Sequence, residues 1–416
     1  MEYAILSLNW RSNVKHTIEL RSVYVSILLL GVVSLMGDIV YEGSRGLIPD
    51  FLKFLGATAF VVGLVSGLGE FLGYATRLIS GFLADTTRAY WVFMFIGYGL
   101  IASIPLLGLA NGWEIAAILV LLERLGKACR SPSRDTIISI VSRGMGAGKA
   151  FGIHEFLDQV GAVAGPLLVA TLMLYSGNNY RLSFSILTIP FTILIAALTY
   201  TYLRIGSKTV LEPTVDVKKA DKALRKPFYV YTLAVTLNTV GLIPASLILY
   251  KASAILQPEQ QQWIVPLIYL LIQGIDAPAA LTSGYLYDRL GIKILALPFI
   301  LSILPPVFTM LNSGLTTLII ASIFFGVVLG VQESTYRAAV SAFTETSSRG
   351  LAYGIFNAAY GVGFLASGAI YGLMIDFNVQ PVLTLIFAVS TQAVALAILM
   401  QAHRGLEKST TSNSTT

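Results

Sequence analysis

The part of this sequence best suited to charge chemistry is the stretch 123–135, ERLGKACRSPSRD, which lies between two apolar runs. Glu123, Lys127, Arg130 and Arg134 are spaced at i, i+4, i+7 and i+11, so they share one stripe of an α-helix. A charge that faces lipid at mid-membrane costs at least about 2.5 kcal/mol, so the stripe is predicted to face water or charged partners. We favour a stripe that lines a transport path; the alternative is a structural ladder of ion pairs.

A second group of ionisable residues lies near the N-terminus. Asp38, Glu42 and Arg45 are spaced at i, i+4 and i+7 and therefore share a helix face. A buried carboxyl group can take up and release a proton, because burial favours its neutral form and a nearby arginine favours its charged form. We therefore expect Asp38 and Glu42 to be the leading proton carriers, with Arg130 or Arg134 as the competing cation.

Two more acids are candidates for coupling. Glu70 lies near the middle of a second apolar stretch, and Asp158 lies in a later one, near His154. For both acids, proton coupling and static ion pairing remain open, whereas His154 is interpreted as a pairing partner. At comparable depth, the second half of the chain offers only Asp276, Glu333 and Arg337. We therefore expect the first half to manage charge and the second half to shape the substrate pocket.

Composition limits the class of protein. Of 416 residues, 55% are hydrophobic and 12% are charged, about half the charged share of a soluble domain, so we predict a polytopic membrane protein. One cysteine, Cys129, and three scattered histidines predict no disulfide, no metal site and no cofactor. An intramembrane enzyme would need a nucleophile with a base, or a metal set, and is disfavoured because His154 is the only histidine in a predicted span and Cys129 the only thiol. The basic residues are spread over loops, which disfavours a nucleic-acid partner.

Apolar stretches of about 20 residues predict twelve transmembrane helices. They lie at 22–48, 58–80, 91–110, 114–140, 150–175, 182–203, 227–250, 261–283, 293–312, 315–340, 350–375 and 380–401. We predict an all-α membrane protein with a six-helix bundle at 1–204, a central loop at 205–226 and a second six-helix bundle at 227–404. Residues 405–416 are predicted to be a disordered tail.

The distribution of basic residues predicts the orientation. Eighteen lysines and arginines fall in the N-terminal segment, the even-numbered loops and the C-terminal tail, whereas the other side holds only Lys53, Arg181 and Lys251. Basic loops stay in the cytoplasm, so both termini and the central loop are predicted to be cytoplasmic in a multi-pass protein of the cell membrane.

The two halves repeat. Gly81-Phe-Leu-Ala-Asp85 recurs as Gly284-Tyr-Leu-Tyr-Asp288 and Arg134 recurs as Arg337, both at an offset of 203 residues. Ala150-Phe-Gly-Ile recurs as Ala352-Tyr-Gly-Ile at an offset of 202. A near-constant offset predicts two units of the same topology. In addition, the apolar stretches of the third, sixth, ninth and twelfth predicted helices contain no charged residue, so we expect these four to face lipid and the others to border a central cavity.

This pattern resembles the Major Facilitator Superfamily over nearly the whole chain. The family's signature is a glycine-led loop after the second helix, with an aspartate and basic residues. It is matched by Gly81, Asp85 and Arg88, and by Gly284, Asp288, Arg289, Gly291 and Lys293. The first copy departs from the family pattern at Thr86-Thr87 and Ala89-Tyr90. The resemblance implies two six-helix bundles and a gate at these loops.

Physical reasoning supports the gate separately. Gly81 permits close approach of two backbones, and Asp85 at a helix end can pair with Arg134 and with the positive N-terminus of the helix at 350–375. Arg337 is the counterpart of Arg134 in the second half. The alternative interpretation is a turn that ends a helix and carries solvated charges.

A further motif bears on the direction of transport. Gly161, Gly165 and Pro166 resemble the glycine–proline motif of antiporter branches of the superfamily, although Leu168 and Val169 replace its second glycine pair. Small residues four apart also allow close helix packing, which explains the stretch equally well.

The resemblance implies a secondary active transporter that works by alternating access, with a small-molecule substrate, protons and the lipid bilayer as partners. Protons are favoured over sodium because the buried carboxylates lie among basic residues. Export by proton antiport is slightly favoured; uptake of an anionic or zwitterionic metabolite by proton symport is the alternative. A transporter-like solute sensor is a third hypothesis. One chain supplies a complete pathway, so we expect a functional monomer.

Overall fold

The structure, a computed structural model, describes residues 2–142, 145–206, 224–311, 314–345 and 348–413. In these ranges the ordered elements are helices, and ten segments are long and apolar enough to cross a membrane. Two further crossings bring the number to the predicted twelve. One is α6 (Trp113–Val141), which is charged; the other arises because Ile264–Met310 contains two crossings.

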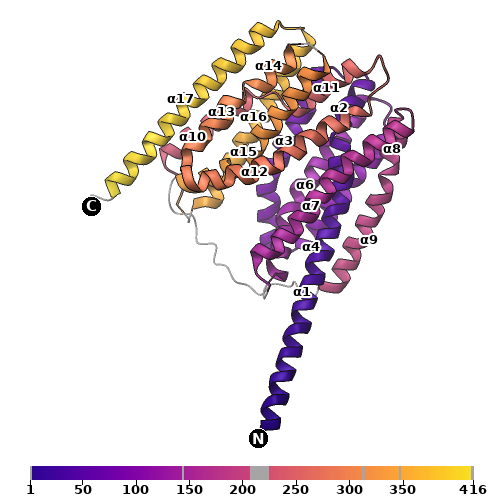
Figure 1. The fold of residues 1–416 in the computed structure, drawn as a ribbon, viewed down its shortest axis with the longest axis vertical. Coiled ribbons are helices and arrows are strands. Elements are labelled where there is room, and N and C mark those ends of the chain that lie inside the picture. Colours follow the sequence, from indigo (N-terminus) through magenta and orange to yellow (C-terminus); the bar gives the residue numbers. More distant parts are fainter. Residues whose placement is uncertain (1, 143–144, 207–223, 312–313, 346–347, 414–416) are drawn as a thin grey trace.

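The helices form two bundles that follow one another along the chain (Figure 1). The first contains α1 (Glu2–Arg45), α2 (Ile48–Phe54), α3 (Ala59–Thr87), α4 (Tyr90–Gly99), η1 (Leu100–Ala102), α5 (Ser103–Leu106), η2 (Leu107–Leu109), α6, α7 (Ala147–Tyr175), α8 (Tyr180–Ile186) and α9 (Thr188–Ile205). The second contains α10 (Lys226–Val240), α11 (Ala245–Leu256), α12 (Ile264–Leu290), η4 (Gly291–Leu295), α13 (Ala296–Leu301), α14 (Leu304–Met310), α15 (Leu315–Phe343), α16 (Arg349–Asp376) and α17 (Pro381–Asn413).

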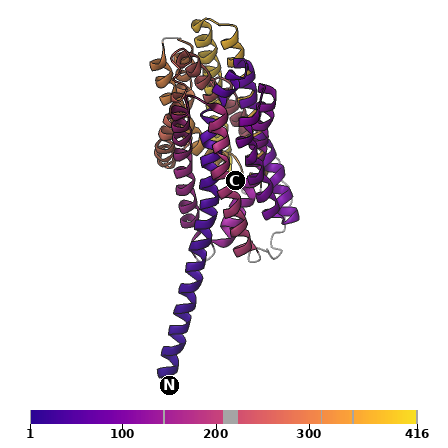
Figure 2. The same ribbon diagram turned by 90° about the vertical axis from the view of Figure 1, so that its right-hand side faces the viewer.

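The ends of the chain differ from the prediction. α1 begins at Glu2 and projects beyond the bundle, as Figures 1 and 2 show, so it starts well before the predicted span. α17 continues to Asn413, so the structure has helix where residues 405–413 were expected to be disordered. Most of the predicted central loop, residues 207–223, lies outside the described residues.

Contacts between the bundles follow the repeat. α3 of the first half packs on α16 of the second, and α12, the counterpart of α3, packs on α7, the counterpart of α16. The interface of α3 with α16 is the tighter one: a Cβ added at Gly63 would lie 2.1 Å from the carbonyl oxygen of Gly368. The absence of side chains at these two positions is what allows the backbones to meet.

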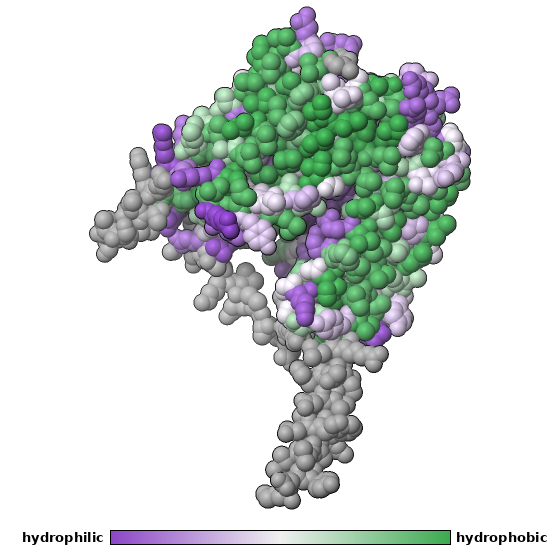
Figure 3. Space-filling model, in the orientation of Figure 1, coloured by the Kyte–Doolittle hydropathy of each residue, from purple (hydrophilic) through white to green (hydrophobic). Residues whose placement is uncertain are grey.

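A cavity of about 460 Å³ lies between the halves. Its lining comes from α1, α2, α3, α6, α7, α11, α12, α15 and α16, together with Pro244, and includes no residue of α4, α9, α13, α14 or α17. The prediction that every third helix stays away from the central cavity is therefore confirmed. Figure 3 shows a hollow with hydrophilic residues between the halves on the side where α1 projects. We call this side the open end.

At the opposite side, the closed end, the halves are joined by hydrogen bonds. The carboxylate of Asp376 at the end of α16 accepts from the backbone N–H groups of Ala59 and Phe60, at 2.8 Å each, and so caps α3 from the other half. The Nζ of Lys53 donates to Oε1 of Gln257 at 3.1 Å, and the hydroxyl of Ser253 donates to Asp50. These contacts must break if the closed end is to open.

Candidate functional site

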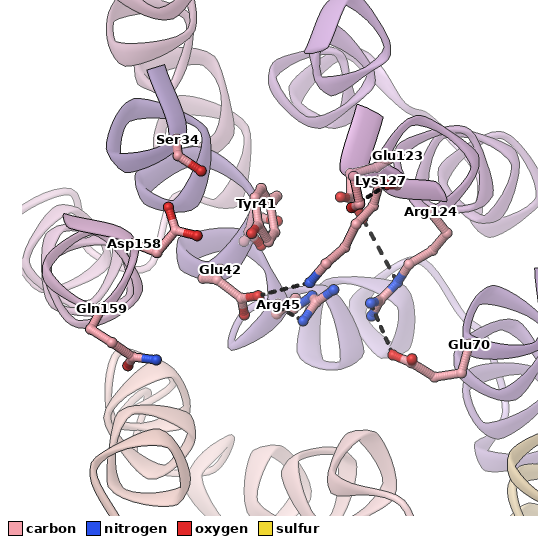
Figure 4. A network of polar contacts seen from close by, with 12 residues as sticks. Ser34, Tyr41, Glu42, Arg45, Glu70, Glu123, Arg124, Lys127, Asp158 and Gln159 are labelled. Carbon is pink, nitrogen blue, oxygen red and sulfur yellow. Dashed lines mark hydrogen bonds and ion pairs between the residues drawn. The ribbon is translucent and has the colours of Figure 1, made fainter. Parts of the chain in front are cut away.

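Glu42 on α1 is the centre of the polar network in the first half. Its Oε1 accepts a hydrogen bond from Nη1 of Arg45 at 2.7 Å and lies 3.6 Å from Nζ of Lys127 on α6 (Figure 4). Its Oε2 accepts from the hydroxyl of Tyr269 on α12 at 2.6 Å. Glu42 is 5% exposed. Its buried carboxylate is thus stabilised by two cations of its own half and one hydrogen-bond donor of the other half.

Asp38 lies one turn before Glu42 and lines the same cavity. It is 4% exposed, yet no cationic nitrogen lies within 4.0 Å of its carboxylate in the part of the chain that the structure describes. The structure therefore separates the two leading candidates: Glu42 is matched by cations at short range and Asp38 is not. A buried carboxyl group without a cation is the one that burial drives towards its neutral form.

The ring of Tyr41 contacts two cations of α6. Nζ of Lys127 lies 4.9 Å and the guanidinium of Arg130 lies 4.8 Å from the centre of its ring. Arg130 is also 5.2 Å from the ring of Tyr98, so it is held between two aromatic rings. Its terminal nitrogens make no hydrogen bond in the described ranges, and the nearest carboxylate oxygen, of Glu123, is 3.7 Å away.

Two further acids are paired with arginines of α6. Nη1 of Arg124 lies 2.9 Å from Oε1 of Glu70, and its Nε lies 3.7 Å from Glu123 (Figure 4). Glu123 is buried and is the member of the predicted stripe that does not line the cavity. The stripe is therefore mixed: its three basic residues face the cavity, and its acid forms part of the ion-pair network behind them.

Arg134 is the most fully paired cation of the site. Its Nε lies 3.0 Å from Asp135, and its Nη1 lies 3.4 Å from Asp158 on α7 and 3.2 Å from the hydroxyl of Ser34. Nδ1 of His154 lies 3.6 Å from the same oxygen of Asp158, which is an ion pair only when the imidazole is protonated, so its interpretation as a pairing partner stays a prediction.

These pairings correct one expectation. Arg130 and Arg134 were predicted to compete for Asp38 and Glu42, but Arg134 is paired with Asp158 and Asp135, and Arg130 is held by rings. The cations at Glu42 are Arg45 and Lys127 instead. Spacing along one helix cannot show which neighbouring helix supplies the partner.

The expected gate is not formed in this conformation. Asp85 is exposed and accepts a hydrogen bond from the hydroxyl of Tyr90 at 3.0 Å, and it makes no ion pair with Arg134 in the described ranges. A Cβ added at Gly81 would lie 3.4 Å from Pro132, and one added at Gly284 would meet nothing within 4 Å, so neither glycine makes a close backbone approach here.

The remaining loop residues lie at the open end. Arg88 ends α3 in the left-handed conformation, with φ of 55°. Asp288 and Arg289 are exposed near the end of α12. An open gate is the arrangement expected when the other end of the molecule is closed.

The glycine–proline motif packs α7 against α1. A Cβ added at Gly161 would lie 2.6 Å from the carbonyl oxygen of Leu35, and one added at Gly165 would lie 2.7 Å from that of Ile39. Pro166 lies inside α7 without ending it. The motif therefore packs the two helices closely, and its resemblance to antiporter branches stays a prediction.

The second half has a neutral counterpart to the charged network. Oδ1 of Asn238 accepts from Nε2 of Gln332 at 2.9 Å and from the hydroxyl of Tyr336 at 2.6 Å, and its Nδ2 donates to Gln392 at 2.7 Å and to Ser302 at 3.2 Å. All these residues are buried. The network joins α10 to α15 and α17 without a formal charge.

Sequence reasoning missed several residues of the site. Arg124 was placed in a span but given no role, and Tyr269 was not singled out, because a tyrosine in an apolar helix carries no signal of its own. Asp50 was also missed. It lies in the short helix α2, which begins after Leu47 with Pro49 in its first turn, whereas the predicted first span ends at residue 48 and leaves Asp50 in a loop.

Comparisons with known proteins agree with the fold. The profile of the Major Facilitator Superfamily matches residues 27–293 and 228–415. An uncharacterized protein of Mycobacterium tuberculosis is 35% identical over 389 residues, covering 91% of this chain and 93% of the relative. An uncharacterized MFS-type transporter of Methanocaldococcus jannaschii is 26% identical over 392 residues, covering 91% and 95%.

Solved structures of transporters are similar in fold. The nucleoside transporter NupG has a TM-score of 0.71 at 15% identity, over 91% of this chain and 99% of that chain. A bacterial homolog of the human lysosomal transporter Spinster, in an inward-facing and unoccupied conformation, has a TM-score of 0.67 at 14% identity, over 93% and 98%.

Proposed function

This chain belongs to the Major Facilitator Superfamily and is a secondary transporter of that family, and from this premise we propose that it moves a small organic solute by alternating access in exchange for protons. The observation that carries the proposal is a cavity between the halves that is lined by two buried acids. Asp38 has no cationic nitrogen within 4.0 Å in the described ranges, and Glu42 is hydrogen-bonded across the halves.

Asp38 is proposed as the proton carrier. Its burial disfavours the charged form, and no cation within 4.0 Å in the described part of the chain offsets that cost. Because it faces the cavity, a proton can reach it through water whenever the cavity is open to one side.

Glu42 is proposed to connect proton binding with rocking of the halves. In this conformation, donors from Arg45 and Tyr269 stabilise its carboxylate. If the closed end opens, α12 moves away from α1 and Glu42 loses Tyr269, so its charged form loses one donor. Proton uptake is then favoured in that second conformation, and proton release is favoured on return to the first one.

We propose the following orientation and gate. With the termini in the cytoplasm, as the basic loops predict, the open end faces the cytoplasm. The proton then enters from the outside and leaves inside, which is the direction that export by antiport requires. Asp85 with Arg134, and Asp288 with Arg337, are proposed to meet when the open end closes. The protein is proposed to reside in the cell membrane as a functional monomer.

Uptake by proton symport is the second candidate. An anionic or zwitterionic solute is favoured because two basic residues of the cavity, Arg77 and Arg337, have no carboxylate oxygen within 4.0 Å in the described ranges. Eight acidic residues line the cavity beside the seven basic ones, which are Arg45, Arg77, Arg124, Lys127, Arg130, Arg134 and Arg337. A proton that entered with such a solute would offset its charge. The two candidates are distinguished by the direction in which a pH gradient drives the solute.

The test uses purified protein and proteoliposomes. A thermal-shift screen at two pH values first identifies a stabilising solute. We expect Asp38→Asn and Glu42→Gln to abolish transport driven by a pH gradient while solute counterflow survives, because counterflow needs no net proton movement. Glu114→Gln, an exposed carboxyl on α6 that does not line the cavity, is the matched control. Full gradient-driven transport in both variants would refute the assignment.

A further inference from the structure

We propose that Arg337 on α15 and Arg77 on α3 together hold an anionic group of the transported solute, a carboxylate or a phosphate, between the two halves. The inference deepens the proposed function and rests on it in one respect, namely that this cavity carries the solute. Both arginines line the cavity, and they come from opposite halves of the chain.

The repeat explains why Arg337 has no close carboxylate in this conformation, within the ranges that the structure describes. Arg134 occupies the equivalent position in the first half, where Asp135 at 3.0 Å and Asp158 at 3.4 Å match its guanidinium. At offsets of 203 and 202 residues, the second half has Ala338 and Tyr360. The second half thus keeps the arginine and lacks both carboxylates.

Nearby groups do not take over this role. Glu333 lies one turn earlier on α15 and within electrostatic reach, but no carboxylate oxygen lies within 4.0 Å of the Arg337 guanidinium in the ranges that the structure describes. Tyr360 is already engaged, because its hydroxyl donates to Oε1 of Gln332 at 2.9 Å and its ring packs on Tyr74 at 5.4 Å. The exposed side chain of Arg337 is therefore available to a ligand.

Arg77 is the second arginine of the proposed anion site. Its guanidinium lies 5.8 Å from the ring of Tyr74 and within electrostatic reach of Arg337. Its Nε is buried and has no hydrogen-bond partner in the described ranges, and no carboxylate oxygen lies within 4.0 Å. The Nε is thus a buried donor without an acceptor, which is a costly arrangement, and the residue that carries it lines the cavity.

The chemistry of the two groups selects the ligand. A guanidinium presents parallel N–H donors in a planar fork that matches the two oxygens of a carboxylate or a phosphate. Two guanidinium groups on opposite halves repel one another until an anion lies between them. A bound anion therefore replaces repulsion by attraction and draws α3 and α15 together. Binding at this position would favour closure of the open end.

The first test measures binding in detergent with inorganic phosphate and benzoate as the probes. We expect each probe to raise the unfolding midpoint of the wild type, and we expect Arg337→Gln and Arg77→Gln to weaken the apparent affinity at least tenfold. Arg337→Lys keeps the charge without the fork and should weaken binding less than Arg337→Gln. Arg204→Gln, on the exposed surface of α9, is the matched control and should bind as the wild type does.

The outcomes separate this inference from proton coupling. Binding of the probes does not require proton movement, so Asp38→Asn should still bind them. Unchanged affinity in both arginine-to-glutamine variants would overturn the inference, provided that their unfolding midpoints without a probe match the wild type. If a midpoint is lowered, the comparison of Arg337→Lys with Arg204→Gln decides instead. If neither soluble probe stabilises the protein and only nanodiscs containing phosphatidic acid do, the two arginines form a lipid site. That result would also overturn the inference.

Discussion

Asp50 joins the halves at the closed end, and we predict that its protonation controls how readily that end opens. Its carboxylate accepts hydrogen bonds from the hydroxyl of Tyr180 at 2.9 Å and from that of Ser253 in the other half. Lys53 is the neighbouring cation that acts on it. Asp50 is 2% exposed, and burial, the largest influence, raises its pKa from 3.8 to about 6.

The size of the effect follows from this difference. If opening hydrates Asp50, its pKa returns towards 3.8, so the closed form binds the proton more tightly than the open form. Acidification therefore favours the closed form. A difference of about 2 pKa units destabilises the closed form by up to about 3 kcal/mol above pH 6, and this penalty disappears as the pH falls towards 4. Between pH 5 and pH 8, the ratio of closed to open molecules should fall about tenfold.

The assay is a distance measurement across the closed end. In a background with Cys129→Ser, spin labels at Phe54→Cys and Ile255→Cys report on α2 and α11, where both original side chains are exposed. We expect the wild type to shift towards longer distances from pH 5 to pH 8. Asp50→Asn should stay closed at both values, because its side chain carries no charge.

A matched control tests whether any carboxyl group at this end gives the same result. Glu259→Gln removes an exposed carboxylate from the loop after α11 and should behave as the wild type. The reasoning is refuted if the wild type shows no shift between the two pH values, or if Asp50→Asn shows the same shift as the wild type.

Two further predictions concern packing within and between the halves. Gly368→Leu should prevent the closed end from forming, because a Cβ there would lie 2.0 Å from the carbonyl oxygen of Gly63. The same spin-label pair should then report longer distances at every pH. Unchanged distances would contradict this prediction. Asn238→Leu should lower the free energy of unfolding by about 2–4 kcal/mol, because it leaves the buried Gln332 and Gln392 without their partner. If the variant unfolds in detergent at the same midpoint as the wild type, the network does not stabilise the fold.

Features that depend on position along the chain could be predicted from the sequence. The twelve spans follow from runs of about 20 apolar residues, and the two bundles follow from the constant offset of the repeat. The helices that stay away from the cavity follow from their lack of charge, since an ionisable side chain at membrane depth needs water or a partner. These features require no knowledge of which helices meet.

Pairings between helices could not be predicted in the same way. Glu70 has Arg77 seven residues later on its own helix, yet its partner is Arg124 on α6. Helix spacing identifies the face on which a side chain lies, but the neighbour on that face depends on tertiary packing. The bond of Tyr269 to Glu42 is a further example, because it spans 227 residues and involves a side chain with no charge.

The repeat becomes informative when the partners of equivalent residues are compared. Position 130 holds an arginine between two tyrosine rings, whereas position 333, its equivalent at an offset of 203, holds the acid Glu333. Position 158 holds an acid that pairs with Arg134, whereas position 360 holds a tyrosine that bonds to Gln332. At position 360 the second half thus has a neutral hydrogen bond where the first half has an ion pair, and at position 333 it has the opposite charge. Arg337 keeps the arginine without the close carboxylates of Arg134: Glu333 lies one turn away, but no carboxylate oxygen lies within 4.0 Å of the guanidinium in the described ranges. An exposed guanidinium at the wall of the cavity without a close carboxylate is the physical reason to assign its charge to the solute.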